Sequence, residues 1–303
     1  MRLVLFADPD FPSSMRLLVA TLREAAERDD IEIAAVVDAG AEQRSPFHAP
    51  SELAKWGIRS AFNPRTVTDR ARRPLTSSCR SVASRWRTPV LVPPQRRVND
   101  PSFVETVRNI APDATLALMV GQIFRAPLLD ACRRSINYHD GLLPHYRGVA
   151  ATGWSIYRGE SQSGFTFHRM AERVDQGPIL VQGLVQVAPH DDCEQVEYAK
   201  TQEARRELNG LFDRLAAADG SIEQSGPGSS FSRAELRAIR AVEQPQALTE
   251  AELQLRVRAF GFVELSLRGA KWDATALRRV GRRRRSRPLA FMTADGIWLE
   301  PRR

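Results

Sequence analysis

The sequence predicts an α/β fold with an open, mostly parallel sheet, because short apolar runs alternate with segments of helical periodicity. The first 40 residues show this pattern most clearly. Apolar runs at residues 3–7 and 31–37 enclose four apolar side chains at helical spacing: Leu17, Leu18, Leu22 and Ala25. A strand, a helix and a second strand in this order predict a parallel pair. Ser13 or Ser14, in the polar turn at residues 8–14, is expected to cap the helix.

The same order resumes after residue 100 and completes a Rossmann-like sheet with flanking helices. Asp100 is expected to cap a helix that runs from Pro101 to residue 110, since proline fits the first helical turn. Three further helices are expected at residues 128–132, 150–157 and 191–218, the last with Asp191 or Asp192 near its cap. Four further strands are expected at residues 113–120, 135–138, 164–170 and 178–187.

Two regions depart from this regular order. Residues 41–99, rich in Pro, Ser and Arg, are predicted to be a variable excursion with one buried strand at residues 89–92. Residues 219–230, rich in Gly and Ser, are predicted to link a catalytic domain at residues 1–218 to a small C-terminal α+β region at residues 231–303. In that region we expect helices at 233–240 and 250–259 and a strand pair at 262–267 and 289–299.

The composition is that of a globular protein in a reducing compartment. Hydrophobic residues make up 43% and charged residues 26% of the 303 residues. No apolar run reaches the roughly 18 residues of a membrane span. Asp8 ends the apolar N-terminal stretch too early for a signal peptide, so we expect a cytoplasmic protein. The three cysteines, at 79, 132 and 193, are widely spaced, which argues against a disulfide framework and a thiolate zinc site.

The formal charge of +8 comes almost entirely from arginine, since lysine stands only at positions 55, 200 and 271. Arginine binds phosphates and carboxylates with two parallel hydrogen bonds. An anionic substrate, a polyglutamylated cofactor or a nucleic acid would each suit this charge. A coding bias toward arginine explains the same composition equally well.

A polar segment follows the strand expected at residues 135–138. Asn137 and His139 stand two positions apart at the end of this strand, so strand alternation places both side chains on the same side of the sheet. Open α/β sheets bind ligands at the carboxyl ends of their strands. Gly141, Pro144 and Gly148 then shape the loop. The spacing therefore predicts a polar site at this edge of the sheet.

Asp175 follows 36 positions after His139, in a turn just before the strand expected at residues 178–187. A loop aspartate can reach a histidine across a cleft, orient its imidazole and favour the protonated form. Taken singly, such a histidine is more often a satisfied core or surface residue, and an aspartate before a glycine is more often turn chemistry. The prediction of a site therefore rests on the combination with Asn137.

These residues and their surroundings resemble the 10-formyltetrahydrofolate-dependent formyltransferases. This family includes methionyl-tRNA formyltransferase, glycinamide ribonucleotide transformylase and the sugar N-formyltransferases. Its pattern is Asn-x-His, then Leu-Leu-Pro-x-Tyr-Arg-Gly, then Asp-x-Gly-x-Ile-Leu, and the chain has these residues at 137–139, 142–148 and 175–180. Gly121-Gln122-Ile123, after the strand that begins near Asp113, resembles the folate-flanking loop of the family. The resemblance is specific across residues 110–190.

The resemblance implies formyl transfer from the folate to an amine, with catalytic roles for three residues. Asn137 would hold the formyl oxygen, and His139 would donate a hydrogen bond or a proton to the oxyanion. Asp175 would orient His139 and help to remove the proton that the amine sheds. The amine of the substrate is the nucleophile in this family, so neither a Ser or Cys nucleophile nor a metal is expected.

The resemblance also implies two sets of binding residues. The co-substrate 10-formyltetrahydrofolate is expected to contact Met119, Val120, Gly121, Gln122, Ile123, Leu142, Pro144 and Val174. The acceptor is expected to contact Asp10, Ser13, Ser14, Asp140, Tyr146 and Arg147.

The acceptor is the part that the motifs specify least. Asp140-Gly141 stands where the family commonly has Pro-Ser or Asn-Ser, next to the three catalytic residues. The C-terminal region is shorter than the tRNA-binding domain of methionyl-tRNA formyltransferases and resembles the short extension that sugar N-formyltransferases often use for dimer contacts. We therefore expect a small-metabolite amine as the acceptor, such as a nucleotide-linked amino sugar or another specialised-metabolite amine. A homodimer is expected by resemblance alone, and no membrane partner is expected.

Three alternative functions stay open. Methionyl-tRNA formylation is the first, and the arginines at 282–285 would then contact tRNA phosphates instead of forming a solvated turn. Hydrolysis of 10-formyltetrahydrofolate by the same three residues is the second. The third is a folate-binding or tRNA-binding protein without catalysis, which would have no reason to keep Asn137, His139 and Asp175 together. Glycinamide ribonucleotide formylation is less expected, because the turn at residues 8–14 lacks a Gly-rich phosphate loop.

Overall fold

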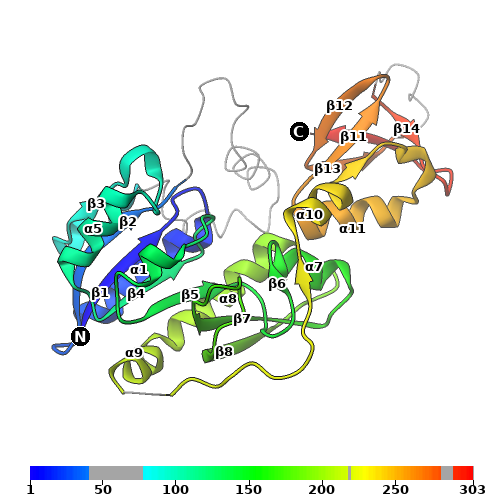
Figure 1. The fold of residues 1–303 in the computed structure, drawn as a ribbon. Coiled ribbons are helices and arrows are strands. Elements are labelled where there is room, and N and C mark those ends of the chain that lie inside the picture. The colour runs from blue at the N-terminus through cyan, green and yellow to red at the C-terminus, as the bar shows by residue number, and fades with distance from the viewer. Residues whose placement is uncertain (41–77, 218–219, 281–288, 303) are drawn as a thin grey trace.

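A seven-stranded sheet forms the centre of the computed structural model, which describes residues 1–40, 78–217, 220–280 and 289–302 (Figure 1). The strand order is β3-β2-β1-β4-β5-β7-β8. The strands are β1 (Arg2–Ala7), β2 (Glu32–Asp38), β3 (Val90–Leu91), β4 (Ala114–Leu118), β5 (Ser135–His139), β7 (Gln162–Arg169) and β8 (Ile179–Gln186).

The first five strands of this order pair in parallel, and β7 and β8 pair in antiparallel fashion at one edge. The predicted α/β class with a mostly parallel sheet is therefore confirmed. Parallel pairing places the carboxyl ends of β1, β4 and β5 at the same edge of the sheet, which is where the polar segments of the sequence follow.

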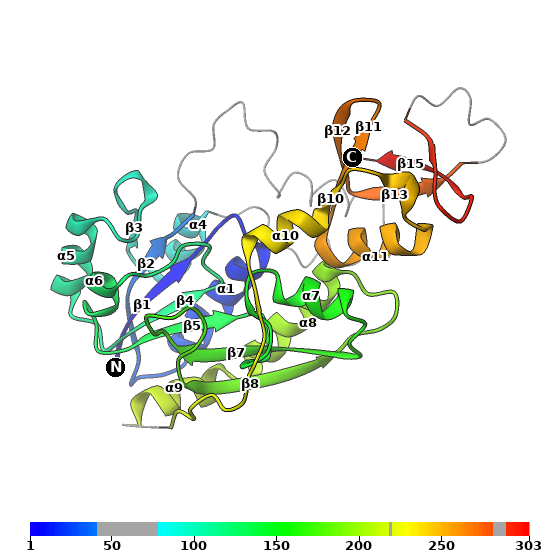
Figure 2. The same cartoon turned by 45° about the vertical axis from the view of Figure 1, so that its right-hand side comes forward.

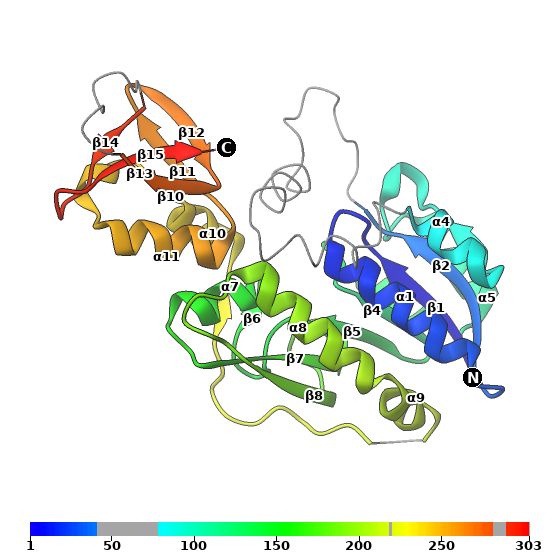
Figure 3. The ribbon, with the colours of Figure 1, turned by 180° about the vertical axis from the view of Figure 1, so that it is seen from behind.

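Helices cover both faces of the sheet. On one face lie α1 (Pro12–Ala26), α8 (Cys193–Arg206) and α9 (Leu208–Ala216), which stand in front of the strands in Figure 3. On the other face lie α5 (Pro101–Ile110) and α6 (Ala126–Leu129), seen beside the sheet in Figure 2. The sheet is thus buried on both sides, as expected for parallel strands.

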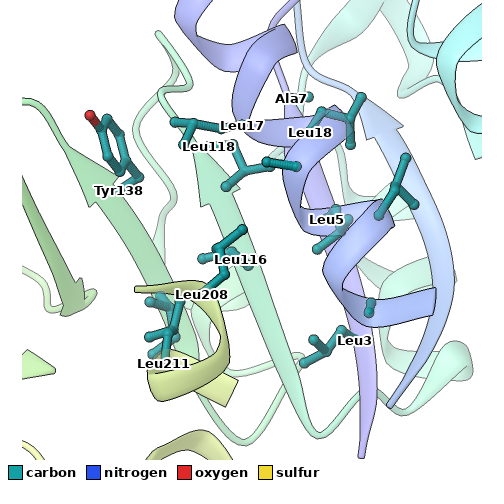
Figure 4. Packing of buried hydrophobic residues seen from close by; sticks show 14 of the residues in the cluster. Leu3, Leu5, Ala7, Leu17, Leu18, Leu116, Leu118, Tyr138, Leu208 and Leu211 are labelled. Atoms are coloured by element: carbon teal, nitrogen blue, oxygen red, sulfur yellow. The ribbon is translucent and has the colours of Figure 1, made fainter. Parts of the chain in front are cut away.

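Alternate residues of each central strand point into two separate cores. Leu3 and Leu5 of β1 pack with Leu116 and Leu118 of β4 under α1 and α9 (Figure 4). Their neighbours in the sequence pack on the opposite face, where three side chains of α5 cover them: Phe103, Val104 and Val107. Successive side chains of a strand point to opposite faces of the sheet, so these apolar runs fill a packed layer on each face.

Two details of the predicted helices are wrong. The N-cap of α1 is Phe11, without a side-chain hydrogen bond, because Ser13 and Ser14 already lie inside the helix. Ser14 Oγ instead accepts a hydrogen bond from the backbone N–H of Asp8 at 2.8 Å. The long helix expected at residues 191–218 is two helices, α8 and α9, which meet at Glu207. Asp192 does cap α8, in a capping box with Gln195.

The excursion predicted at residues 41–99 is described only from residue 78 onward, and residues 41–77 lie outside the described residues. Residues 78–99 contain α4 (Cys79–Ala83), two short 3-10 helices, η1 (Ser84–Trp86) and η2 (Pro94–Arg96), and strand β3. The strand predicted at residues 89–92 is present, but it is only half-buried because it forms the edge of the sheet.

The C-terminal region holds two small sheets instead of one strand pair. One sheet has the order β10 (Ala241–Val242), β11 (Val263–Leu267) and β12 (Ala270–Ala274). The other has the order β13 (Ala276–Arg279), β15 (Trp298–Arg302) and β14 (Phe291–Met292). The single strand expected at residues 289–299 is wrong, because Gly296 has φ 77° and the chain turns back there. The arginines at 282–285 lie outside the described residues.

Three helices complete the described part of this region: α10 (Arg233–Arg240), η3 (Pro245–Ala247), which is a 3-10 helix, and α11 (Glu250–Phe260). The region packs on α7 (Ala151–Tyr157) of the larger part (Figure 1). The Trp154 ring stacks on Phe231 with centroids 4.5 Å apart and meets the edge of Phe260 at 5.0 Å. A Cβ on Gly153 would lie 2.6 Å from the Ala259 carbonyl oxygen, so α11 approaches α7 closely only because residue 153 is glycine.

Residues 220–231, which we call the connecting segment, are hydrogen-bonded to the larger part of the protein. Ile222 exchanges two backbone hydrogen bonds with Ile179, at 2.7 and 2.8 Å. Further along, β9 (Ser230–Phe231) pairs in parallel with β6 (Arg147–Gly148). The segment therefore touches the loop that carries the Leu-Leu-Pro-x-Tyr-Arg-Gly pattern. The expected boundaries at 218, 219–230 and 231 stay a prediction.

Within the described part of the chain, no helix is long and apolar enough to cross a membrane.

The central packing predicts a large cost for truncating Leu116, which is 0% exposed between two flanking strands. Leu116→Ala should lower the free energy of unfolding by about 2–5 kcal/mol, because the removed methyl groups leave a cavity in a close-packed core. Leu184→Ala is the matched control, since Leu184 is 50% exposed. Urea unfolding measures both, and equal losses for the two variants would contradict this packing.

Candidate active site

A cavity of about 670 Å³ opens at the carboxyl ends of β4 and β5. Its walls come from β5, from the loops after β4 and β7, and from α8 and α10. The size is that of a small-molecule site. The edge of a parallel sheet is where such a site is expected, so the topology and the cavity agree.

Asn137 and His139 both line this cavity, while Tyr138 between them points the opposite way into the core. The Tyr138 ring stacks on Phe165 at 5.7 Å. The strand alternation of β5 thus places the two polar side chains together, and core packing of the residue between them fixes the register.

His139 is only 5% exposed, and both of its ring nitrogens face protein atoms. Its Nε2 lies 2.7 Å from the Tyr146 carbonyl oxygen, and its Nδ1 lies 3.5 Å from Asp175 Oδ2. Because a carbonyl only accepts hydrogen bonds, Nε2 carries a hydrogen. When Nδ1 is also protonated, the imidazolium charge faces the carboxylate. The 3.5 Å separation is long for a hydrogen bond, so an Nδ1–H stays open to an oxygen that enters the cavity.

Asp175 is held in an unusual backbone conformation, with φ 55° in the left-handed region. Its Oδ2 accepts a hydrogen bond from the backbone N–H of Gly148 at 2.8 Å. Burial raises the pKa of this carboxyl, but the charge of His139 and the hydrogen bonds from His168 and Gly148 outweigh it and hold the pKa at about 2. Asp175 is therefore an anion at neutral pH, beside two imidazoles.

A second histidine, His168, completes the cluster and is absent from the sequence prediction. It lies on β7 directly opposite Asn137 in the antiparallel pair. Its Nε2 is 3.3 Å from Asn137 Nδ2 and 3.5 Å from Asp175 Oδ1, and its Nδ1 donates to the Arg169 carbonyl at 2.8 Å. Nε2 therefore lies between the Asn137 amide and the Asp175 carboxylate. Only the register between β5 and β7 brings this residue into the site.

The cluster can stabilise negative charge on an oxygen and move a proton. The Asn137 amide and His139 are hydrogen-bond donors at the cavity wall, in a site largely shielded from water, where such bonds are strong. The Asp175 carboxylate behind them stabilises an imidazolium. These are the requirements of acyl transfer to a nucleophile that the substrate itself supplies.

Gln224, in the connecting segment, ties together the two loops that hold Asp175. Its Nε2 donates to the carbonyl oxygens of Asp175 and Gly177, both at 2.8 Å. Its Oε1 accepts from Arg147, with Nη2 at 2.7 Å and Nε at 3.1 Å. Because Gly148 follows Arg147 and bonds the Asp175 carboxylate, Gln224 positions both ends of that contact. Sequence patterns in a Gly- and Ser-rich segment carry no signal for such a role.

Six of the eight residues predicted to bind the co-substrate line the cavity: Met119, Val120, Gly121, Gln122, Ile123 and Val174. Leu142 and Pro144 are not among its lining residues. A Cβ on Gly164 would meet the Leu142 side chain at 3.1 Å, so Leu142 packs on β7. The Pro144 carbonyl accepts from the Ser229 N–H at 3.2 Å, so Pro144 faces the connecting segment.

Of the six residues predicted to bind the acceptor, only Asp10 and Asp140 line the cavity. Ser13 and Ser14 are buried in α1, where Ser13 Oγ donates to Glu197 at 3.2 Å. The Tyr146 side chain stacks on Phe231 and donates to Glu160, and the Arg147 side chain bonds Gln224. The predicted roles of these four side chains therefore have no support from their positions.

A buried charged group beside Asp140 was also absent from the prediction. Lys200 is fully buried, and its Nζ donates to the Asp140 carbonyl at 2.7 Å and to Thr152 Oγ1 at 2.8 Å. Glu197, one helical turn before it, lines the cavity. Burial and the negative charge of Asp140 raise the pKa of Glu197 to about 7. The cavity wall formed by α8 thus carries a carboxyl that titrates near neutral pH.

Comparison of the sequence with known proteins finds matches to formyltransferases. Residues 61–211 match the family model described as formyl transferase. The chain is 32% identical over 139 residues to methionyl-tRNA formyltransferase from Geobacter sulfurreducens, which covers 46% of this chain and 43% of that protein. It is 31% identical over 136 residues to GDP-perosamine N-formyltransferase from Brucella melitensis, which covers 45% of this chain and 52% of that protein. The matches thus span about half the length of these curated relatives.

The fold is also similar to a solved structure over nearly the whole length of both chains. The N-formyltransferase from Helicobacter canadensis, in complex with folinic acid and dTDP-3-aminofucose, superposes with a TM-score of 0.61. The alignment covers 99% of this chain and 98% of that chain at 16% identity. At this identity the likeness supports the fold.

Gln224→Ala should lower the free energy of unfolding by about 1–3 kcal/mol, because it leaves the Asp175 and Gly177 carbonyls without their donor. Gln224→Glu should not restore the loss, since a carboxylate cannot donate to either carbonyl. Glu223→Gln, an exposed neighbour, is the matched control and should change stability by less than about 0.5 kcal/mol. Chemical denaturation measures all three, and an unchanged Gln224→Ala variant would contradict the positioning role.

The raised pKa of Glu197 predicts a pH-dependent stability. A carboxyl whose pKa rises from 4.5 to about 7 on folding binds a proton more tightly in the folded state. Its contribution is therefore full below about pH 4.5 and is lost as the pH rises through about 7. Glu197→Gln should be more stable than the parent protein by about 2 kcal/mol at pH 8, and this gap should close at pH 5. A gap that is the same at both pH values would show that Glu197 titrates normally.

Proposed function

Residues 61–211 match the formyl transferase family, and we propose from this premise that the protein is an N-formyltransferase. It transfers the formyl group of 10-formyltetrahydrofolate to a primary amine of a small metabolite. One observation carries the proposal: Asn137 and His139 line a single cavity, with the Asp175 carboxylate held behind them. This arrangement serves a reaction in which an oxygen gains charge and an amine loses a proton.

The chain's own residues divide the work of this transfer. The Asn137 amide and the Nδ1–H of His139 donate hydrogen bonds to the formyl oxygen as the amine nitrogen attacks the formyl carbon. The Asp175 carboxylate, 3.5 Å from His139 Nδ1, stabilises an imidazolium that forms during the transfer. A water beside Asp175 takes the proton that the amine sheds, and the bond from the formyl carbon to the folate nitrogen breaks as that nitrogen gains a proton.

The cavity fits a folate beside these residues. Its volume of about 670 Å³ lies within the range of small-molecule sites. Met119, Gly121 and Ile123 offer wall and backbone groups on one side, and Val174 lies on the loop that also carries Asp175. We propose that the pterin end of the folate rests between these two loops, which would bring its formyl group to Asn137 and His139.

A nucleotide-linked amino sugar is the acceptor that we propose. GDP-perosamine N-formyltransferase is among the relatives, and the similar Helicobacter canadensis structure holds dTDP-3-aminofucose. Asp10, Asp140 and Glu197 are among the residues that line the cavity. Their carboxyl groups attract an amine and help to orient it toward the formyl carbon.

Methionyl-tRNA formylation is the second candidate, because a methionyl-tRNA formyltransferase is 32% identical over 139 residues. The two candidates differ in the acceptor alone. Incubation of the protein with 10-formyltetrahydrofolate and either amino-sugar nucleotides or charged initiator tRNA separates them by consumption of the folate. Transfer only to tRNA would overturn the sugar acceptor, and turnover without any amine would indicate a hydrolase.

His139→Ala and Asp175→Ala should each lower turnover by about a hundredfold or more, while folate binding survives. Each variant removes a group that acts on charge developing during the transfer, and neither removes the walls that hold the folate. His145→Ala is the matched control, since His145 is exposed and is not among the cavity-lining residues. Steady-state kinetics and folate titrations measure the two effects. Near-normal turnover in either variant would overturn the catalytic assignment.

A further inference from the structure

One face of α10 contributes three arginines to the cavity. Arg233, Arg237 and Arg240 recur at intervals of four and three residues, which places them on one side of the helix. All three, together with Leu236 between them, line the cavity. We call these residues the α10 arginine face. The mechanism above uses none of them.

Both ends of this face are anchored by hydrogen bonds to other residues that line the cavity. Arg233 Nη2 donates to the Gly121 carbonyl at 2.9 Å. Arg240 Nη2 donates to the Phe260 carbonyl at 2.8 Å, and its guanidinium lies 4.4 Å from the Phe262 ring centroid. The two anchors are seven positions apart in the sequence, which is about 10 Å along the helix axis. The N-terminal end of the helix therefore lies next to the Met119–Ile123 loop.

The side chain of Arg237, in the middle of the face, is exposed and makes no hydrogen bond or ion pair with any described residue. The one acidic residue of α10, Glu235, is engaged in a capping box with Ser232. The carboxyl groups of the cavity stand on other elements: Asp10, Asp140, Glu172, Asp175 and Glu197. A ligand with an anionic end is therefore favoured in one orientation, with that end at α10.

We propose that the α10 arginine face binds the carboxylates of the glutamate tail of the folate. The inference rests on the proposed function. A folate whose pterin lies between the Met119–Ile123 loop and Val174 extends its glutamate end along the cavity. Arg233, which donates a hydrogen bond to the Gly121 carbonyl, marks where α10 begins beside that loop. Guanidinium groups bind carboxylates with two parallel hydrogen bonds. Each added glutamate supplies another carboxylate, so the face selects polyglutamylated folate.

Binding of a folate that does not react provides the test, since no acceptor is then needed. The probes are the monoglutamate and triglutamate forms of 5-formyltetrahydrofolate, titrated by calorimetry into the full-length protein at low salt. The triglutamate should bind the parent protein about tenfold more tightly, equivalent to roughly one well-made charged contact. Arg237→Gln should reduce this advantage to less than about threefold, because one guanidinium fewer then remains for the added carboxylates. Arg237→Lys should keep part of it.

Arg268→Gln is the matched control, because it removes the same charge from an exposed turn of the C-terminal region and is not among the cavity-lining residues. It should keep the full triglutamate advantage. Equal Kd values of the two folates for the parent protein would overturn the inference. So would an Arg237→Gln variant that weakens dTDP binding and leaves triglutamate binding unchanged, since the face would then serve acceptor phosphates. Failure of both folates to bind the parent protein would contradict the proposed function itself.

Discussion

The contact between the Asp175 carboxylate and the Gly148 N–H is the constraint on which the site depends. It joins the loop after β7 to the loop after β5, at 2.8 Å. Asp175 reaches this position only in the left-handed backbone region, with φ 55°. A non-glycine residue there costs free energy, which the surrounding hydrogen bonds must supply. The two imidazoles beside the carboxylate then take their places relative to it.

Packing elsewhere makes this contact possible. The Tyr138 ring in the core fixes the register of β5, and the antiparallel pair with β7 sets His168 opposite Asn137. From the other side, Gln224 holds the backbone of the Asp175 loop and the side chain of Arg147. The connecting segment therefore also helps to hold the residues of the site in place. The site is rigid because three separate elements meet at one turn.

The parts of this site that depend on local periodicity were predictable from the sequence. Alternation along one strand places Asn137 and His139 together, and the parallel order of the first strands follows from the strand-helix-strand pattern. His168 was not predictable, because its place depends on the register between β5 and β7, and the sequence pattern of neither strand gives that register. The same holds for Gln224 and for the α10 arginines, whose partners lie on other elements. Ser13 and Ser14 show the converse: their place in a polar turn suggested contact with the acceptor, but both lie buried in α1 and bond Glu197 and Asp8 instead.

The charges of the cavity come from different elements of the fold, and this links catalysis to recognition. Carboxyl groups from α8 and from the loops after β1, β5 and β7 line the same cavity as three arginines from α10. A ligand that carries both an amine and an anionic group is therefore favoured in some orientations over others.

The most direct measurement is a crystal structure of the protein with 5-formyltetrahydrofolate bound. The account predicts a folate between the Met119–Ile123 loop and the Asp175 loop, with its one-carbon group beside Asn137 and His139. An oxygen of that group should lie within hydrogen-bond distance, about 2.7–3.2 Å, of Asn137 Nδ2 or His139 Nδ1. A folate bound outside this cavity, or one whose one-carbon group points away from both residues, would contradict the central claim.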